Sequence, residues 1–246
     1  MKLLLDTNIY LDFYRTNFET VDLFKSIIKN YKKLILTDQI IEEFDRNREG
    51  VLQTIKTVFE KESKIQDISS SFLKSVPAFA ELTEIQRAYK VKRTIVSDVI
   101  TSFIKDESKD PVASLFKELV NVSKKRDLIL YSNDEIIRRA ETRKRKGNPP
   151  TSSKYSIGDE INWEIVLSKV TDDIVIVGRD TTYRDNLSFL RKDFHKSTGK
   201  IIHTLTDKIS DGLLLVGIKT KRKTVENEVA AVKQLQAFSD YWQVGK

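Results

Sequence analysis

Four acidic residues occupy positions from which an α/β sheet delivers side chains to a common site. Asp6 and Asp180 come at the ends of short apolar runs, which are typical of parallel strands buried on both faces. Glu43 and Asp159 fall in the first turns of predicted helices that enter from the same ends of the strands. Ligands of open α/β sheets bind in the crevice outside the carboxyl ends of the strands. We therefore expect the four carboxylates to converge on one pocket.

A pocket of this kind favours metal-assisted chemistry. Carboxylates that lie close together repel, and they persist only when they share a proton or a cation. A hard divalent cation such as Mg²⁺ or Mn²⁺ suits carboxylate oxygens combined with a substrate phosphate. The chain has no cysteine, and its two histidines, His195 and His203, lie outside any H-x-x-x-H spacing. Thiolate chemistry and cysteine-based zinc sites are excluded, so an enzyme of this sequence relies on carboxylates, alone or with a hard metal ion.

The composition is that of a folded, basic protein. A length of 246 residues with 39% hydrophobic residues is sufficient for a real core. The chain has 43 Lys and Arg against 36 Asp and Glu, and the resulting net charge of +7 favours a polyanionic partner. The N-terminal apolar run is broken at Asp6, and no run reaches the roughly 18 apolar residues of a membrane span. We expect neither a signal peptide nor a membrane span, and we predict a cytoplasmic protein.

Hydrophobic patterning separates a strand-containing part from a helical part. Three apolar runs predict buried parallel strands: 3–5, 34–36 and 174–177. Two weaker runs leave the choice open, since 128–131 is a short strand or a helix end and 201–202 is a candidate last strand. From about 50 to 124, long amphipathic helices follow one another without a strand signal, which predicts an all-helical insertion. Within it, Thr83 and Gln86 have the spacing of a capping box and predict a helix start.

The end of the chain predicts one more helix. Apolar residues spaced by three or four indicate a C-terminal amphipathic helix at about 222–244. We expect the whole chain, 1–246, to form a single α/β domain. In this domain a central parallel sheet is flanked by helices and interrupted by the helical insertion at about 50–124.

A dense basic run precedes the loop that leads to Asp159. Its members are Arg138, Arg139, Arg143, Lys144, Arg145 and Lys146. The run stops at Gly-Asn-Pro-Pro, where two prolines after a glycine end a helix. It reads either as a solvated helix end with favourable dipole charges or as a contact surface for a phosphate backbone. Its density and its position before the acidic motif favour nucleic-acid binding.

The acidic positions also resemble those of a known family. Four blocks are similar to the four acidic motifs of PIN-domain nucleases: Leu-Leu-Leu-Asp6-Thr7-Asn8, Thr37-x-x-Ile40-x-x-Glu43-Phe44, Gly158-Asp159-x-x-Asn162-Trp163 and Val-Ile-Val-x-x-Asp180-x-x-Tyr183. The chain is more similar still to a bacterial PIN-like group that carries a long helical insertion and a Gly-Asn-Pro-Pro...Lys...Gly-Asp-x-x-x-Trp block. The resemblance spans residues 1–48 and 128–206.

The resemblance implies a PIN-like, Rossmann-like parallel sheet and a Mg²⁺- or Mn²⁺-dependent endoribonuclease. The catalytic, metal-binding residues would be Asp6, Glu43, Asp159 and Asp180. The metal ion would orient and deprotonate a water for in-line attack on an RNA phosphodiester. We expect Asn8 to hold Asp6 or the attacking water, and Lys154 to stabilise the phosphate as a point charge. Partners would be RNA and either a second copy of the chain or a protein inhibitor such as an antitoxin.

Two features depart from the PIN motifs, and one aromatic residue has two readings. Glu42 competes with Glu43 for the second motif. Thr181 or Thr182 stands where a further acid is often found. Trp163 is expected to pack as a core aromatic between helix and sheet, and the other reading is a platform on which a base stacks.

Three other functions compete with a ribonuclease. A haloacid-dehalogenase-like phosphohydrolase also places an aspartate at the end of its first strand, but it requires a second aspartate where Asn8 stands. A structure-specific DNA nuclease of related fold would use the helical insertion as a clamp. A catalytically silent nucleic-acid-binding scaffold would keep the fold without turnover. The four intact acids argue against that scaffold, because uncompensated carboxylate repulsion costs stability.

Overall fold

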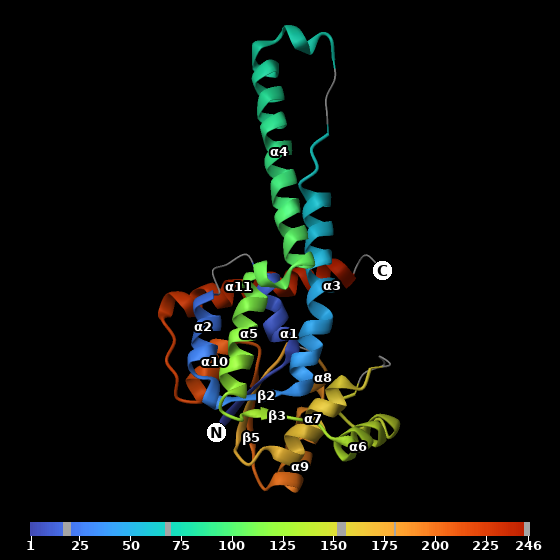
Figure 1. Ribbon diagram of the computed structural model, residues 1–246, viewed down its shortest axis with the longest axis vertical. Helices are drawn as coiled ribbons and strands as arrows, with labels where there is room; N and C mark the ends of the chain where they lie inside the picture. The colour runs from blue at the N-terminus through green and yellow to red at the C-terminus, as the bar shows by residue number, and fades with distance from the viewer. Residues whose placement is uncertain (17–20, 67–69, 152–155, 180, 244–246) are drawn as a thin grey trace. The chain divides into compact units, whose positions relative to one another are not determined.

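The computed structural model describes residues 1–16, 21–66, 70–151, 156–179 and 181–243. These residues form a five-stranded parallel sheet in the order β3-β2-β1-β4-β5 (Figure 1). The strands are β1 (Lys2–Leu5), β2 (Leu34–Thr37), β3 (Ile129–Leu130), β4 (Ile174–Val177) and β5 (Ile202–Thr206). The predicted α/β fold with a central parallel sheet is confirmed, and both runs that the sequence left open contain strands.

The apolar runs become strands because the sheet buries both of their faces. The side chains of Leu3, Leu4 and Leu5 in β1 are buried, as are all four of β4. From β1 the chain moves outward to β3 on one side, and β4 and β5 lie on the other side. The topological switch point therefore lies between β1 and β4, where ligand crevices of open α/β sheets form. Asp6 and Gly178 are the first residues beyond these two strands.

Helices connect the strands. They are α1 (Thr7–Leu11), α2 (Val21–Lys29), α3 (Asp38–Glu62), α4 (Pro77–Lys105), α5 (Pro111–Lys124), α6 (Asp134–Arg145), α7 (Gly158–Lys169), α8 (Thr181–Asp185), α9 (Leu187–Thr198), α10 (Ile209–Leu215) and α11 (Arg222–Gln243). Short 3₁₀ helices occupy Asp12–Tyr14, Tyr31–Lys33, Leu73–Ser75 and Glu107–Lys109.

Two aromatic clusters hold together the helices that carry the candidate site. In the first, Phe44 of α3 stacks on Phe116 of α5 with 3.9 Å between ring centroids, and Tyr10 of α1 meets the same ring at 5.1 Å. In the second, Trp163 of α7 lies 6.4 Å from the ring of Tyr183 in α8 and also packs against α9. Aromatic pairs bury large apolar areas in defined orientations, so these clusters fix the helices next to the candidate site residues.

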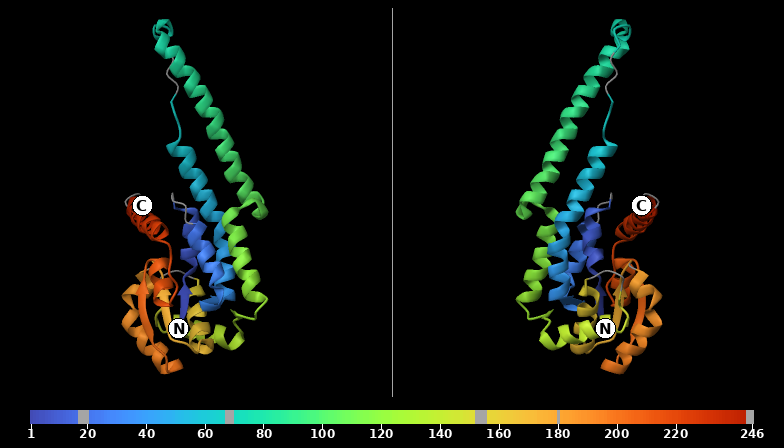
Figure 2. Two further views of the ribbon diagram at one scale, coloured as in Figure 1. Left: turned by 90° about the vertical axis from the view of Figure 1, so that its left-hand side faces the viewer. Right: turned by 90° about the vertical axis from the view of Figure 1, so that its right-hand side faces the viewer.

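The chain divides into two compact units. Unit 1 comprises 1–47 and 115–246, and unit 2 comprises 48–114. In unit 2, α3 and α4 lie side by side (Figures 1 and 2), and Arg93 of α4 donates to the Glu60 carbonyl of α3 at 2.6 Å. The described residues of unit 2 are helical or irregular. That the whole chain is one PIN-like domain stays a prediction.

One predicted helix start in unit 2 is wrong. α4 begins at Pro77, where proline occupies the first helical position and its missing N–H costs no hydrogen bond. Thr83 lies inside the helix, and its hydroxyl donates to the Phe79 carbonyl at 2.8 Å instead of capping a helix start. A threonine can satisfy its hydroxyl in either place, so the spacing of a capping box alone did not locate the first turn.

The last helix of the chain is fastened to unit 1 by a buried carboxylate. Glu228 of α11 accepts the backbone N–H groups of Ile209 and Ser210 at 2.5 and 2.9 Å, and thereby caps the N-terminus of α10. α10 lies against the sheet, and a side chain at Gly212 would meet Leu3 and Val177 at 2.8 and 2.7 Å. None of the helices in the described part of the chain combines the length and the hydropathy needed to cross a membrane.

Candidate active site

Asp6 projects from the switch point of the sheet. Its backbone N–H donates to the Val177 carbonyl at 2.9 Å, which holds the end of β1 against the end of β4. The side chain is buried, and the Asn8 amide donates to Asp6 Oδ2 at 3.3 Å. Asn8 itself is exposed. A carboxylate at this edge is thus oriented by a neighbour two residues along the chain.

Glu43 comes from α3 and is held by two hydrogen bonds. Thr7, the residue after Asp6, donates its hydroxyl to Glu43 Oε2 at 2.7 Å, and Gln39 donates to Oε1 at 2.9 Å. Because α3 begins at Asp38, Glu43 lies in its second turn and not in the first turn that the sequence suggested. Glu42 is exposed, so Glu43 is the acid of this pair that is tied to the β1 end.

The start of α7 abuts Glu43. A Cβ atom placed on Gly158 would lie 2.0 Å from Glu43 Oε1 and 2.8 Å from Gln39 Nε2. A side chain there would have to displace these two groups, so glycine at this position allows α7 to approach the carboxylate. Asp159 follows directly in the first turn of α7 and is half-buried. Sequence reasoning quoted Gly158 as part of a motif but gave it no role.

A buried tyrosine links three of the four predicted acids. Tyr183 is 2% exposed, and burial raises its pKa well above the ordinary value. The negative charges of Asp159, Asp6 and Glu43 raise the pKa further, while a hydrogen bond with Asn162 lowers it. The hydroxyl therefore stays protonated at neutral pH. Carboxylates from the end of β1, from α3 and from α7 all act on this one group, which the fourth motif contains but to which the sequence assigned no role.

The contacts of Asn162 extend the same network to the end of β2. Thr37 donates its hydroxyl to Asn162 Oδ1 at 2.7 Å, and the Ile40 N–H donates to the same Thr37 oxygen at 3.1 Å. Thr37 thus caps the start of α3 and orients Asn162, which hydrogen-bonds with Tyr183. The ends of β1 and β2 and the starts of α3 and α7 are joined by hydrogen bonds in this region.

Two predicted site residues, Asp180 and Lys154, lie outside the described residues. Arg179, just before Asp180, pairs with the buried Asp12 and donates to the Asp207 carbonyl at 3.1 Å, which anchors the end of β4. Thr181 is exposed at the start of α8. Among the residues that the structure describes, no group of three or more His, Cys, Asp or Glu side chains is arranged to hold a metal ion.

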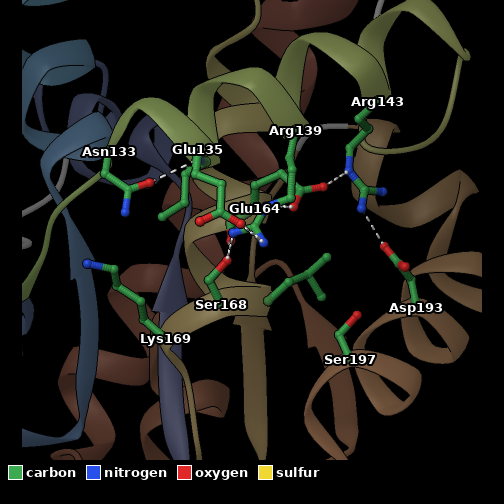
Figure 3. Close-up of a pocket in the computed structure, with 11 residues that line it drawn as sticks. Asn133, Glu135, Arg139, Arg143, Glu164, Ser168, Lys169, Asp193 and Ser197 are labelled. Carbon is green, nitrogen blue, oxygen red and sulfur yellow. Dashed lines mark hydrogen bonds and ion pairs between the residues drawn. The ribbon is translucent and has the colours of Figure 1, made fainter.

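The basic run lies on α6, and one of its members is buried. Arg143 donates to Glu164 Oε1 at 2.7 Å and pairs with Asp193 at 2.8 Å (Figure 3). It also donates to the Pro149 carbonyl at 2.6 Å. Asp193 also accepts from the indole N–H of the fully buried Trp163 at 3.0 Å. Arg143 therefore ties α6, the proline loop, α7 and α9 together, and Trp163 is a core residue.

The other members of the basic run differ in whether they pair with acidic residues or lie exposed to solvent. Arg139 donates to Glu135 and to Ser168 at 3.2 and 2.7 Å along an open pocket of about 540 Å³ between α6, α7 and α9 (Figure 3). Lys144 lies 3.2 Å from the buried Glu160. The exposed remainder consists of Arg138, Arg145 and Lys146. The charged groups of the pocket largely pair with one another, so the basic run points cations to solvent mainly through Arg138, Arg145 and Lys146.

Fold and site together define an α/β protein whose parallel sheet brings acidic side chains to its switch point. A family model described as PIN domain matches residues 3–183, more than half of the chain. The chain therefore belongs to the PIN-domain family, and the predicted family is confirmed. No curated protein and no solved structure matches the chain. The more specific bacterial group stays a prediction.

Membership of the family narrows the functions that the sequence left open. PIN domains are generally nucleases, and they typically use divalent metal ions. A haloacid-dehalogenase-like phosphohydrolase is a different family and is no longer a candidate. The function class is therefore that of a nuclease, whose substrate is a nucleic acid.

Proposed function

We propose that the protein is a metal-dependent endoribonuclease that hydrolyses RNA phosphodiester bonds at Asp6, Glu43, Asp159 and Asp180. The main support is that Asp6, Glu43 and Asp159, which are far apart in the sequence, all act electrostatically on the buried Tyr183 hydroxyl. A second support is the close approach of Gly158 to Glu43, which brings the first turn of α7 to the second acidic motif. Asp180 enters the proposal through its position three residues before Tyr183.

The donor set suits a hard divalent ion. Carboxylate oxygens are the ligands that Mg²⁺ and Mn²⁺ prefer. Mg²⁺ usually binds one or two carboxylates and completes its shell with waters and substrate phosphates, so a preformed group of three acids is not required. In this proposal the carboxylates that bind the ion directly come from Asp6, Glu43, Asp159 and Asp180, and water and substrate phosphate would complete its shell. When bound, it supplies a water nucleophile at neutral pH and neutralises charge on the phosphate.

The chain's own residues position the acids. Thr7 and Gln39 each donate to one oxygen of Glu43, which fixes the orientation of that carboxylate. Asn8 donates to Asp6 Oδ2 and thereby orients the Asp6 carboxylate. Lys154 is proposed to stabilise the pentacoordinate phosphate as a point charge.

RNA is the proposed substrate, and the outer face of α6 is its proposed contact surface. The net charge of +7 favours a polyanion. Arg138, Arg145 and Lys146 are exposed, and the side chain of Arg145 is 81% exposed, so these cations can reach a phosphate backbone. Arg139, Arg143 and Lys144 make the ion pairs described above, so we assign them a smaller share of phosphate contact.

The decisive experiment assays the purified chain on single-stranded RNA, duplex RNA and DNA with Mn²⁺ or Mg²⁺, with and without chelator. We expect chelator-sensitive cleavage of RNA by the wild type and none by Asp6→Asn. RNA affinity, measured by fluorescence anisotropy, should be nearly equal for the two proteins. Cleavage of DNA alone would favour the DNA nuclease. Binding without cleavage at any metal concentration would favour the silent scaffold, and equal cleavage by Asp6→Asn would exclude the proposed role of that residue.

A further inference from the structure

Unit 2 carries most of the exposed apolar side chains among the described residues. Ten of the sixteen large apolar side chains that are exposed lie between Ile65 and Val99. The most exposed are Phe72 at 77% and Ile85 at 66%. α4 has no buried residue along its whole length. Apolar surface concentrated in this way marks an interaction site, whereas single exposed apolar residues need no explanation.

The exposed residues of α4 include a heptad pattern, which we call the α4 stripe. Its members are Leu82, Ile85, Tyr89, Lys92, Val96 and Val99. Their spacing alternates between three and four, which places them along one line of a helix as in a coiled coil. Arg93 and Ser97 mark the side of α4 that contacts α3, where Ser97 donates to Glu60 at 2.6 Å. The stripe borders this side, and Tyr89 at the edge donates to the Ser63 carbonyl at 3.0 Å.

We propose that the α4 stripe is a self-association surface on which α4 of a second copy of this chain packs antiparallel. The stripe is self-complementary about a twofold axis between Lys90 and Val91. In that register Leu82 lies opposite Val99 of the second copy. Ile85 then lies opposite Val96, and Tyr89 opposite Lys92, so that every member meets another member.

The only charged residue of the stripe sets the direction of the pair. In a parallel pair, Lys92 would lie beside Lys92 of the second copy, and two ammonium groups would be forced together. In the antiparallel pair, each Lys92 lies beside a tyrosine ring, where a cation–π contact is favourable. The positions that flank the stripe add no repulsion, because Arg93 then lies near Gln86 and Ala88 lies near Ile95.

A second copy suits this surface better than nucleic acid does. Phosphate binding needs several cations along the contact, and the stripe has one. The stripe covers 18 residues, or about 27 Å of helix. A helix pair of this length buries on the order of 1,000 Å² in total, which is near the lower limit of specific interfaces. We therefore expect reversible association in the micromolar range. The inference is independent of the nuclease activity.

Disulfide trapping tests both the contact and its direction. The natural chain has no cysteine, so introduced thiols have no background. Ile85→Cys and Val96→Cys variants of the full chain should each stay uncrosslinked on mild oxidation, whereas their mixture should form a disulfide-linked dimer. Thr94→Cys, which is exposed and lies on the other side of α4, measures random crosslinking. Crosslinking of Ile85→Cys with itself above that level, or none in the mixture, would overturn the antiparallel pair.

Sedimentation equilibrium gives a second test without cysteines. The wild type should reach a dimer between about 1 and 100 μM, and the double variant Ile85→Glu/Val96→Glu should stay monomeric over this range. Thr94→Glu adds a charge to an exposed position outside the stripe and should dimerise like the wild type. Unchanged circular dichroism would show that the double variant is folded. A wild type that is monomeric throughout, or a double variant that dimerises equally well, would refute the proposal.

Discussion

Gly158 is the position in the candidate site that leaves least room for a side chain. An added methyl group would meet the flexible end of Glu43 at 2.0 Å, so Gly158→Ala would displace that carboxylate while α7 keeps its place. We expect RNA cleavage to fall roughly 10- to 100-fold, because a misplacement of about 1 Å costs this much in a positioned site. Initial rates at saturating RNA, with circular dichroism for folding, provide the measurement.

Gly50 supplies the matched control for this substitution. It also lies in a helix, and an added Cβ would meet nothing within 4 Å. Gly50→Ala should leave cleavage unchanged and raise stability by about 0.5–1 kcal/mol, since alanine is the better helix former. If Gly158→Ala cleaves RNA as fast as Gly50→Ala, then Glu43 has no positional role in catalysis.

The contacts around Glu43 also show which parts of the candidate site could be predicted from the sequence. The order and context of the motifs predicted Asp6, Glu43 and Asp159 as site residues. These three carboxylates raise the pKa of one tyrosine, Tyr183. Asn8 was predicted to hold Asp6 or the attacking water, and it donates to Asp6, but the remote contacts that position Glu43 and Asn162 could not be predicted. Thr7 reaches Glu43 across 36 residues of sequence, and Thr37 reaches Asn162 across 125. A local pattern carries no information on such pairings, because they depend on how the strands are ordered in the sheet.

The basic run on α6 contains both a buried cation with a structural role and cations that are exposed to solvent. Arg143 is buried among Glu164, Asp193 and the Pro149 carbonyl. Arg143→Gln would remove the closest cation from the buried Glu164 and the half-buried Asp193, which keep their contacts with Arg139 and Trp163. We expect a loss of about 3 kcal/mol in the free energy of unfolding, at the lower end for breaking a buried ion pair. Urea denaturation followed by circular dichroism measures the loss.

Arg145→Gln is the comparison on the same helix. This side chain is 81% exposed and lies 4.0 Å from Glu141, so we expect stability to change by less than about 0.5 kcal/mol. Its RNA affinity should fall, with the salt-dependence slope reduced by about 1, as expected for one lost phosphate contact. The reverse pattern, with Arg143→Gln stable and weak in binding, would make the buried arginine a phosphate ligand.

The spacing of apolar residues along α6 indicates which cation of the basic run is buried. Ile136, Ala140 and Arg143 follow the spacing of one helix face, and all three are buried. A charged residue that continues an apolar face indicates a buried ion pair, which density of charge alone does not reveal. Among the elements, β1, β2 and β4 could be predicted from their apolar runs. The order of the strands and the two-residue strand β3 could not be predicted, because they depend on pairing across the sheet.

Folding brings Asp6, Glu43 and Asp159 from remote segments to the surroundings of Tyr183, where each of them raises the pKa of its hydroxyl. If these acids bind a metal ion as proposed, the ion should stabilise the folded state. The wild type would then gain binding energy that Asp6→Asn lacks, which amounts to about 2.7 kcal/mol at a hundredfold excess over Kd. Mn²⁺ should therefore stabilise the wild type more than Asp6→Asn.

Thermal unfolding of the wild type and Asp6→Asn, in chelator and in Mn²⁺, tests this difference. Mn²⁺ should raise the unfolding temperature of the wild type and change that of Asp6→Asn much less. Asp185→Asn removes an exposed carboxylate at the end of α8 and should respond to Mn²⁺ like the wild type. A wild type that Mn²⁺ does not stabilise, or an Asp6→Asn variant that it stabilises equally, would mean that Asp6 does not hold the ion. This readout does not depend on knowing the RNA, so it separates the metal site from the choice of substrate.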